Sequence, residues 1–341
     1  MTNPETTMPA PEFKDRKVGL IVFGILQIIL GVICALLIPF MILGLIMSAT
    51  INKNAGGAMP LGMAVASVLI YVFMAVWFIW LGIGSVKSRR WARALTLVSS
   101  WLWLISGVSG FIFMLALMPD MYGQMARDGK IPQAMTAIMT YIMLGFMSVI
   151  YIVIPGGLVL FYGRKDVRLT CERRDPQPRW TDKCPLPVLA ISLIFAVWAV
   201  AILMTGFYGW VMPCFGYILS GIAGAGVSLA TMAFLGYAAW GAYKLDIKAW
   251  WVGLLTVAVW TVSVAITFWR VDIMEFYAKM NLPSQSLELM KQYNIMKSPL
   301  MTVFFVFWVV AFLAYLIYVK RYFKGLAEPK LSVNAHHDPG K

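Results

Sequence analysis

Long uncharged apolar runs recur along this chain, and short segments rich in charge separate them. Eight runs reach or approach the length of a membrane-spanning helix, at about 18–47, 61–86, 94–118, 136–163, 186–205, 215–243, 249–269 and 299–319. A helix needs about 20 apolar residues to cross the hydrocarbon core of a bilayer. Helices pair their own backbone polar groups in lipid, whereas an isolated strand does not. The pattern therefore predicts an all-α integral membrane protein with eight transmembrane helices.

Composition supports that class and excludes others. Apolar residue types make up 61% of the 341 residues and charged types 13%, against about 45–50% and about 25% in soluble domains. These values exclude a soluble enzyme, a disordered chain and a disulfide-rich secreted module. The first run is too long for the core of a signal peptide, and Glu5, Glu12 and Asp15 precede it, so we expect it to be retained as a span.

The basic residues predict an orientation. Of the 28 Lys and Arg, 21 fall on the side of the predicted membrane that holds both termini and 7 fall on the other side. Because cytoplasmic loops carry the excess of Lys and Arg, both termini are predicted to be cytoplasmic. This placement accounts for the net charge of +13 without nucleic acid as a partner. No Asn-x-Ser/Thr site or organelle address is present, which favours the bacterial plasma (inner) membrane.

The two halves of the chain share an order of features. Trp91 and Thr96 open the third run as Trp251 and Thr256 open the seventh, and each fourth run ends in a Tyr shortly before two basic residues. Such self-similarity indicates an internal duplication. We expect two tandem parallel four-helix repeats with amphipathic outer segments. The predicted parts are a tail, a repeat, a cytoplasmic linker, a second repeat and a second tail, at 1–17, 18–165, 166–185, 186–325 and 326–341.

The predicted spans lack ionisable chemistry. Apart from their last turns they contain no Asp, Glu, His, Lys or Arg, and both histidines lie in the C-terminal tail. Haem on His ligands and a carboxylate-bridged metal centre are excluded from such an interior. A proton-coupled or sodium-coupled carrier is disfavoured, because ionisable residues mark such paths. We therefore predict no enzymatic activity, no cofactor and no metal.

Small residues in the sixth run, which is predicted to open at Pro213, are candidates for helix packing. They recur every four residues, as Gly216, Ser220, Gly224 and Ser228. This spacing lets helix backbones approach closely. The predicted contact lies within the bundle, with a dimer face as the alternative.

Hydroxyl and aromatic residues in the third and seventh runs are candidates for lining a cavity. They are Thr96, Ser99, Ser100, Trp103, Thr256, Trp260 and Thr261. An apolar cavity with a few polar groups is typical of a ligand pocket. The alternative is hydrogen bonding between helices, which is common in membrane bundles.

The outer segments 119–135 and 270–298 are candidates for a lid or docking surface. Their apolar residues are Met121, Tyr122, Met125, Phe276, Tyr277 and Met280. The last three lie at helical spacing. Amphipathic helices at an interface also serve as simple membrane anchors, which is the alternative.

The residue types suggest two metal sites, and each has a plainer interpretation. Met139, Met143 and Met147 form a stripe of soft ligands suited to Cu(I), but the second half has no such stripe, and Met commonly fills apolar gaps. The four cysteines have no close pair, which predicts reduced thiols. Two of them, Cys171 and Cys184, could form a zinc site only with the adjacent His336 and His337, at a spacing that matches no zinc finger.

Two functional classes remain. The uncharged interior favours a non-catalytic scaffold or accessory subunit of a membrane assembly, whose partners are the lipid bilayer and a protein partner or a second copy of the chain. The apparent repeats and hydroxyl-bearing spans leave a carrier or channel for an apolar or neutral small molecule as the alternative.

Overall fold

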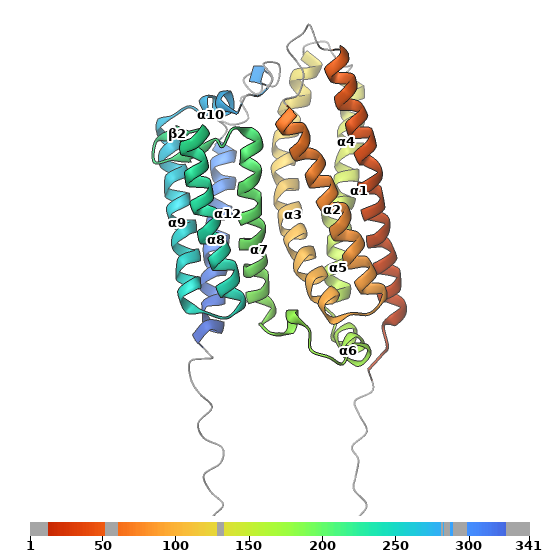
Figure 1. Ribbon diagram of the computed structural model, residues 1–341. Helices are drawn as coiled ribbons and strands as arrows, with labels where there is room; N and C mark the ends of the chain where they lie inside the picture. The colour runs from red at the N-terminus through yellow and green to blue at the C-terminus, as the bar shows by residue number, and fades with distance from the viewer. Residues whose placement is uncertain are drawn as a thin grey trace, which may run out of the picture. The chain divides into compact units, whose positions relative to one another are not determined.

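The computed structural model describes residues 13–51, 61–127, 133–280, 282, 287–288 and 299–324. These residues are helical except for connecting segments and one two-stranded hairpin (Figure 1). Eight of the described helices are long and apolar enough to cross a membrane, at Lys17–Met47, Leu61–Val86, Arg90–Leu115, Ile138–Tyr162, Leu186–Tyr208, Gly221–Tyr243, Ile247–Arg270 and Met301–Phe323. The predicted all-α class and the eight predicted candidate spans are therefore confirmed.

The chain divides into two compact units. The first comprises residues 1–39 and 70–182, and the second comprises 40–69 and 183–341. Because residues 40–69 fall in the second unit, this division differs from a simple cut between residues 165 and 186. The predicted duplication stays a prediction.

The helices that precede residue 183 belong to the first unit, except for the parts of α1 and α2 that lie within residues 40–69. They are α1 (Lys17–Ile51), α2 (Leu61–Val86), α3 (Arg90–Arg127), α4 (Gln133–Ser148), the π-helix η1 (Val149–Val153), α5 (Ile154–Tyr162), α6 (Lys165–Arg174) and the 3₁₀ turn η2 (Trp180–Asp182). The last two lie in the predicted linker 166–185, which is therefore largely helical.

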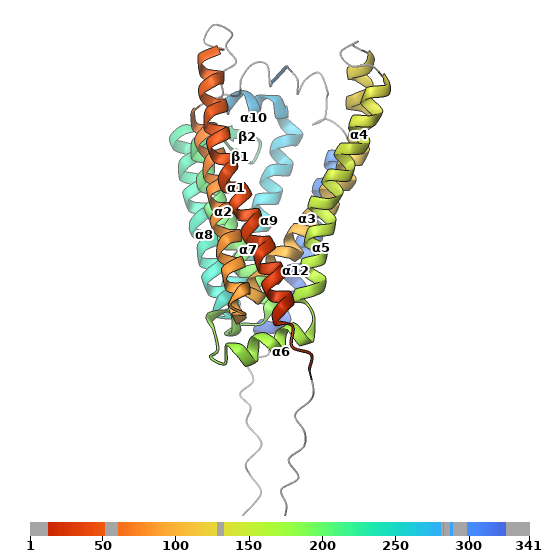
Figure 2. The same cartoon turned by 90° about the vertical axis from the view of Figure 1, so that its right-hand side faces the viewer.

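Helices α1 and α2 run alongside each other and pack through glycine (Figure 2). A Cβ atom on Gly24 would lie 2.9 Å from the carbonyl oxygen of Gly82, and one on Gly82 would lie 2.6 Å from the carbonyl oxygen of Gly24. Seven residues further along α1, a Cβ on Gly31 would lie 2.9 Å from the carbonyl oxygen of Ala75. The backbones therefore meet directly, as small residues permit in membrane bundles.

The fourth candidate span remains helical through Pro155. The π-helix η1 directly precedes this proline. Proline has no N–H and displaces the carbonyl four residues earlier, and a π turn is one way in which a helix accommodates such a break. Gly107 of α3 packs against the carbonyl of Tyr151 in this turn.

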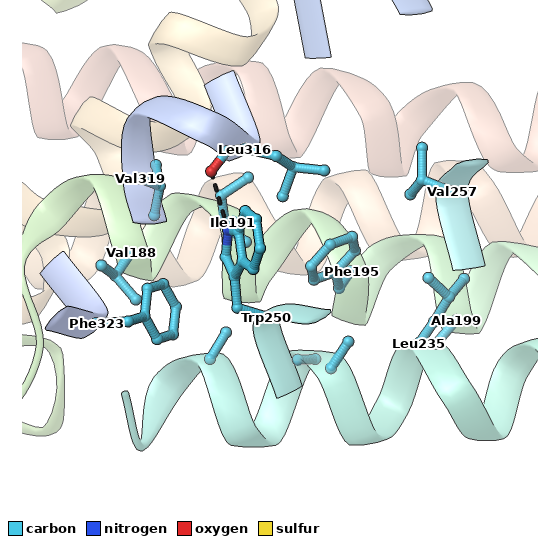
Figure 3. Close-up of a cluster of buried hydrophobic side chains, with 13 residues drawn as sticks. Val188, Ile191, Phe195, Ala199, Leu235, Trp250, Val257, Leu316, Val319 and Phe323 are labelled. Carbon is cyan, nitrogen blue, oxygen red and sulfur yellow. Dashed lines mark hydrogen bonds between the residues drawn. The ribbon is translucent and has the colours of Figure 1, made fainter. Parts of the chain in front are cut away.

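The second unit contains the remaining elements. They are α7 (Leu186–Leu203), the 3₁₀ helix η3 (Met204–Tyr208), β1 (Met212–Cys214), β2 (Tyr217–Leu219), α8 (Gly221–Tyr243), α9 (Ile247–Arg270), α10 (Ile273–Lys279) and α12 (Pro299–Lys324). Their core lies between α7, α8, α9 and α12 (Figure 3). The indole Nε1 of Trp250 donates to the carbonyl oxygen of Leu316 at 2.9 Å, and Gly253 lies against the ring of Phe195.

The sixth span begins later than predicted. Residues 212–219 form an antiparallel hairpin in which Cys214 pairs with Tyr217, and α8 starts at Gly221 instead of near residue 215. Phe215 and Gly216 form the two-residue turn, with φ values of 44° and 95°. Positive φ at both central positions is typical of the tight turns that join strands. The prediction that Pro213 opens this helix is wrong, because Pro213 belongs to β1.

Candidate functional site

Charged residues gather at one end of the first unit, where α1 and α3 begin and α2 and α5 end. We call residues 13–17, 87–93 and 164–182 the basic end. It contains 13 Lys and Arg against 5 Asp and Glu. This is the most polar site among the described residues of the first unit.

Asp175 is the centre of the basic end. Its carboxylate is only 2% exposed, and it accepts hydrogen bonds from the Arg179 guanidinium at 2.6 Å, from the Arg89 guanidinium at 3.3 Å and from the backbone N–H of Arg90 at 3.3 Å. The hydrogen bonds from Arg179 hold the pKa of Asp175 below its usual value. The carboxylate therefore stays ionised and joins the turn between α2 and α3 to the segment after α6.

Arg90 forms a second connection. Its Nε lies 3.2 Å from Asp182 in η2, and a terminal nitrogen lies 3.6 Å from Glu172 in α6. Glu172 also accepts from Arg168 at 2.8 Å. The first turn of α3 is thus paired with two separate parts of the linker.

The segment before α1 is fastened to α6. Asp15 accepts from Arg174 at 2.7 Å, Arg16 lies 3.6 Å from Asp166, and the backbone N–H of Arg16 donates to Thr170 Oγ1 at 3.0 Å. Arg174 lowers the pKa of Asp15. Because charged contacts at both ends of α6 hold it, this short helix has a fixed place in the first unit.

A polar cleft opens between α6 and the segment before α1. It has a volume of about 300 Å³ and is lined by Phe13, Asp15, Thr170, Arg173 and Arg174. The hydropathy pattern does not predict this cleft, because the cleft depends on how the linker folds against the N-terminal segment.

The candidate spans of the first unit contain a buried uncharged cluster. Ser85 Oγ donates to the carbonyl oxygen of Leu20 at 3.0 Å, and Gln27 Nε2 lies 3.5 Å from Tyr162 Oη. Gln27, Ser85 and Tyr162 are each at most 1% exposed. Gln27 Oε1 and the hydroxyl of Thr96 are buried without a hydrogen-bond partner among the described residues.

The predicted cavity residues lie on two helices of different units. Thr96 and Ser100 are buried in α3, and Ser99 and Trp103 are half-buried there. In α9, Thr256 and Thr261 are half-buried and Trp260 is exposed. Thr256 donates to Val252 of its own helix, so its hydroxyl is already satisfied. A shared cavity therefore stays a prediction.

The four predicted packing residues do not lie on one helix. Gly216 is in the hairpin turn, and Ser220 is the residue before α8. Gly224 and Ser228 are buried in α8. Gly224 lies directly against the carbonyl of Trp210, and Ser228 Oγ lies 3.5 Å from the hydroxyl of Thr205. These two therefore pack within the second unit.

Two hydroxyl residues of α9 hold the hairpin. Ser263 Oγ accepts from the backbone N–H of Phe215 at 3.0 Å and donates to the carbonyl of Pro213 at 3.1 Å. Thr267 Oγ1 accepts from the backbone N–H of Gly216 at 3.0 Å. Their sequence signal was the row of hydroxyls in the seventh run, but the hairpin that they bind was not predicted.

The outer candidates are described in part. Phe276 and Tyr277 lie in α10, Met280 follows its last turn, and the ring of Phe276 packs edge-on against Phe268 of α9. Met121, Tyr122 and Met125 lie in α3, but their side chains are outside the described part of the chain. A lid or docking role stays a prediction.

The cysteines and metal candidates show no ligand set in the described part of the chain. All four cysteines are free thiols, and burial raises the pKa of Cys171 to about 12 and that of Cys184 to about 11. Within the described ranges, no group of three or more His, Cys, Asp or Glu could hold a metal ion. The two histidines that a zinc site with Cys171 and Cys184 would need, His336 and His337, lie outside those ranges.

Comparisons with known proteins give no relative. No protein-family model, curated protein or solved structure matches the chain.

Proposed function

We propose that this chain is a membrane protein that serves as a non-catalytic scaffold or accessory subunit of a membrane assembly in the bacterial plasma membrane. The basic end faces the cytoplasm in this proposal, because basic residues are retained on that side. The eight candidate spans cross the bilayer, and both termini are cytoplasmic.

One observation carries the scaffold role. Within each unit, glycines let a neighbouring helix approach so closely that its backbone or an aromatic ring contacts the glycine backbone. Gly24 and Gly82 bring α1 against α2, Gly107 brings α3 against η1, and Gly253 brings α9 against α7. Contacts this close leave no room for a solute between these helix pairs. Helices that contact each other this directly suit a protein that holds partners in place.

A second candidate is a carrier for an apolar or neutral small molecule. The observation that favours it is that two buried atoms of the candidate spans, Gln27 Oε1 and Thr96 Oγ1, have no hydrogen-bond partner among the described residues. Buried polar atoms without partners are costly, and a neutral ligand with hydroxyl or amide groups would satisfy them.

Co-purification separates the two functions. The full chain, tagged at its C-terminus, is extracted from membranes of its native host in mild detergent and analysed by size exclusion and mass spectrometry. A second protein at constant stoichiometry supports the scaffold. A partner-free chain whose thermal stability rises with a small neutral molecule, and whose Thr96→Val variant loses that rise, supports the carrier.

Orientation needs engineered thiols, because Cys171 and Cys184 are buried and stay unlabelled on either side. Gln177 and Tyr217 are exposed and are replaced by Cys one at a time, in a chain carrying Cys34→Ala and Cys214→Ala. We expect an impermeant maleimide to label Tyr217→Cys on intact cells and to label Gln177→Cys only after permeabilisation. The reverse pattern would overturn the orientation.

A further inference from the structure

The basic end has more cationic groups than its own acids can neutralise. Each of the five acids already contacts at least one basic side chain. Seven basic residues hold no ion pair with any described residue, namely Lys14, Lys17, Lys87, Arg93, Arg164, Lys165 and Arg173. The net charge of +8 over these segments therefore remains available to an external anion.

The polar cleft is the place within the basic end where an external anion would bind. Arg173 is exposed at its wall and forms no close ion pair with a described residue, although its charge helps to lower the pKa of Asp15. Arg174 and Asp15 are paired with each other. The adjoining Arg16 has a buried Nε that donates to no described atom. Guanidinium groups present donors in a planar fork that matches the oxygens of a phosphate. The cleft therefore has the donors for one phosphate group.

The position of the cleft favours a lipid as the source of that phosphate. Helix α1 begins at Lys17, and α6 begins three residues after the fourth candidate span ends at Tyr162. If these helices cross the bilayer, as proposed above, the cleft lies at the level of the headgroups. Phe13 adds an apolar wall next to the charged side chains. In a glycerophospholipid, the phosphate would contact the arginines, and the glycerol and acyl chains would contact Phe13.

We propose that this cleft binds the phosphate headgroup of an anionic glycerophospholipid, with Arg173 as the principal contact. Asp15 also lines the cleft, and its negative charge would repel an anion. Its ion pair with Arg174 at 2.7 Å neutralises that charge, so we expect binding to require this ion pair. The inference rests on the proposed membrane location but not on the scaffold role.

Native mass spectrometry of the full chain in detergent tests the proposal with two probes, phosphatidylglycerol and phosphatidylcholine. We expect the first equivalent of phosphatidylglycerol to bind about tenfold more tightly than phosphatidylcholine. Arg173→Gln should weaken phosphatidylglycerol binding about fivefold, since one basic residue near a headgroup contributes about that factor. Arg173→Lys should retain part of it. Lys248→Gln is the matched control, because Lys248 is an exposed basic residue at a helix start in the second unit.

The outcomes separate the alternatives. Equal weakening by Lys248→Gln would show a general charge effect and overturn the site. Displacement of bound lipid by millimolar inorganic phosphate would show a site for free phosphate, and tighter binding of a short RNA would show a nucleic-acid surface; either result overturns the lipid assignment. Recovery of the chain from the soluble fraction would instead contradict the membrane location. Recovery from membranes without a preference for phosphatidylglycerol would contradict this inference alone.

Discussion

The hydroxyl oxygens of Ser85 and Tyr162 lie 2.5 Å apart in the interior of the first unit, where α2 and α5 end. Since Ser85 donates to the carbonyl of Leu20, Tyr162 is the donor to Ser85. Gln27 of α1 reaches the same Tyr162 hydroxyl at 3.5 Å. Hydrogen bonds between uncharged side chains thus join α1, α2 and α5 and fix the register between them.

Removing the Tyr162 hydroxyl should loosen that junction. Tyr162→Phe keeps the ring but leaves Ser85 without its donor and the Gln27 amide without its acceptor. We expect a loss of about 1 kcal/mol in the free energy of unfolding, measured by denaturant titration in detergent. The control is Tyr237→Phe, because Tyr237 is 47% exposed; an equal loss in both variants would refute the role of the cluster.

Asp175 should make stability depend on acid pH. Its hydrogen bonds with Arg179 lower its pKa below the ordinary value of 3.8, so its contribution to stability is complete above about pH 4 and disappears as the pH falls through the lowered pKa. We expect Asp175→Asn to cost about 2 kcal/mol at pH 7. The difference from wild type, followed by thermal unfolding from pH 7 to pH 3, should shrink at the acid end. A difference that stays constant with pH would contradict this assignment.

The contact between α1 and α2 should tolerate no added methyl group at Gly24. A Cβ there would lie 2.7 Å from the Val86 side chain and 2.9 Å from the Gly82 carbonyl oxygen. Because one of these atoms belongs to the backbone, a rotamer change cannot relieve the clash. We expect Gly24→Ala to lower the free energy of unfolding by about 1–3 kcal/mol.

Gly44 is the matched control on the same helix. A Cβ on Gly44 would meet no atom within 4 Å, and Ala is a better helix former than Gly by about 1 kcal/mol. Gly44→Ala should therefore leave the unfolding midpoint unchanged or raise it. If both variants behave alike, the close approach at Gly24 is not what holds the two helices.

Hydropathy predicted most of the helical segments but not the contacts that the helices and loops make with one another. The eight candidate spans follow from runs of apolar residues whose length matches that needed to cross a bilayer. The predicted start of the sixth span was wrong, because the turn at Phe215 and Gly216 delays the helix without interrupting the run of apolar residues. The available signals were Pro213 and the glycines at 216 and 221.

The sequence predicts the positive charge of the basic end but not the arrangement of its side chains. The excess of Lys and Arg is visible in the sequence, whereas the burial of Asp175 depends on its contacts with Arg89, 86 residues earlier. Nothing local distinguishes Asp175 from Asp166 or Asp182. Likewise Gly24 is an ordinary glycine in sequence, and its importance comes from Gly82 on another helix.

The hairpin of the second unit should depend on the two hydroxyls of α9. Ser263 binds Phe215 and Pro213, and Thr267 binds the backbone N–H of Gly216. Without these groups the turn loses its side-chain hydrogen bonds to α9, and its amides open more readily to solvent. We expect the double variant Ser263→Ala and Thr267→Val to raise the hydrogen-exchange rates of the Phe215 and Gly216 amides at least tenfold, because each lost bond contributes about 1 kcal/mol.

Thr256→Val separates this effect from the general loss of a hydroxyl in α9. The Thr256 hydroxyl donates only within its own helix, to Val252, so its replacement should leave exchange at residues 212–219 unchanged. Peptides from α7 provide an internal reference, since their exchange should not change in any of the three proteins. Faster exchange throughout the second unit in the double variant would mean that Ser263 and Thr267 stabilise the whole unit, and would refute a local role at the hairpin.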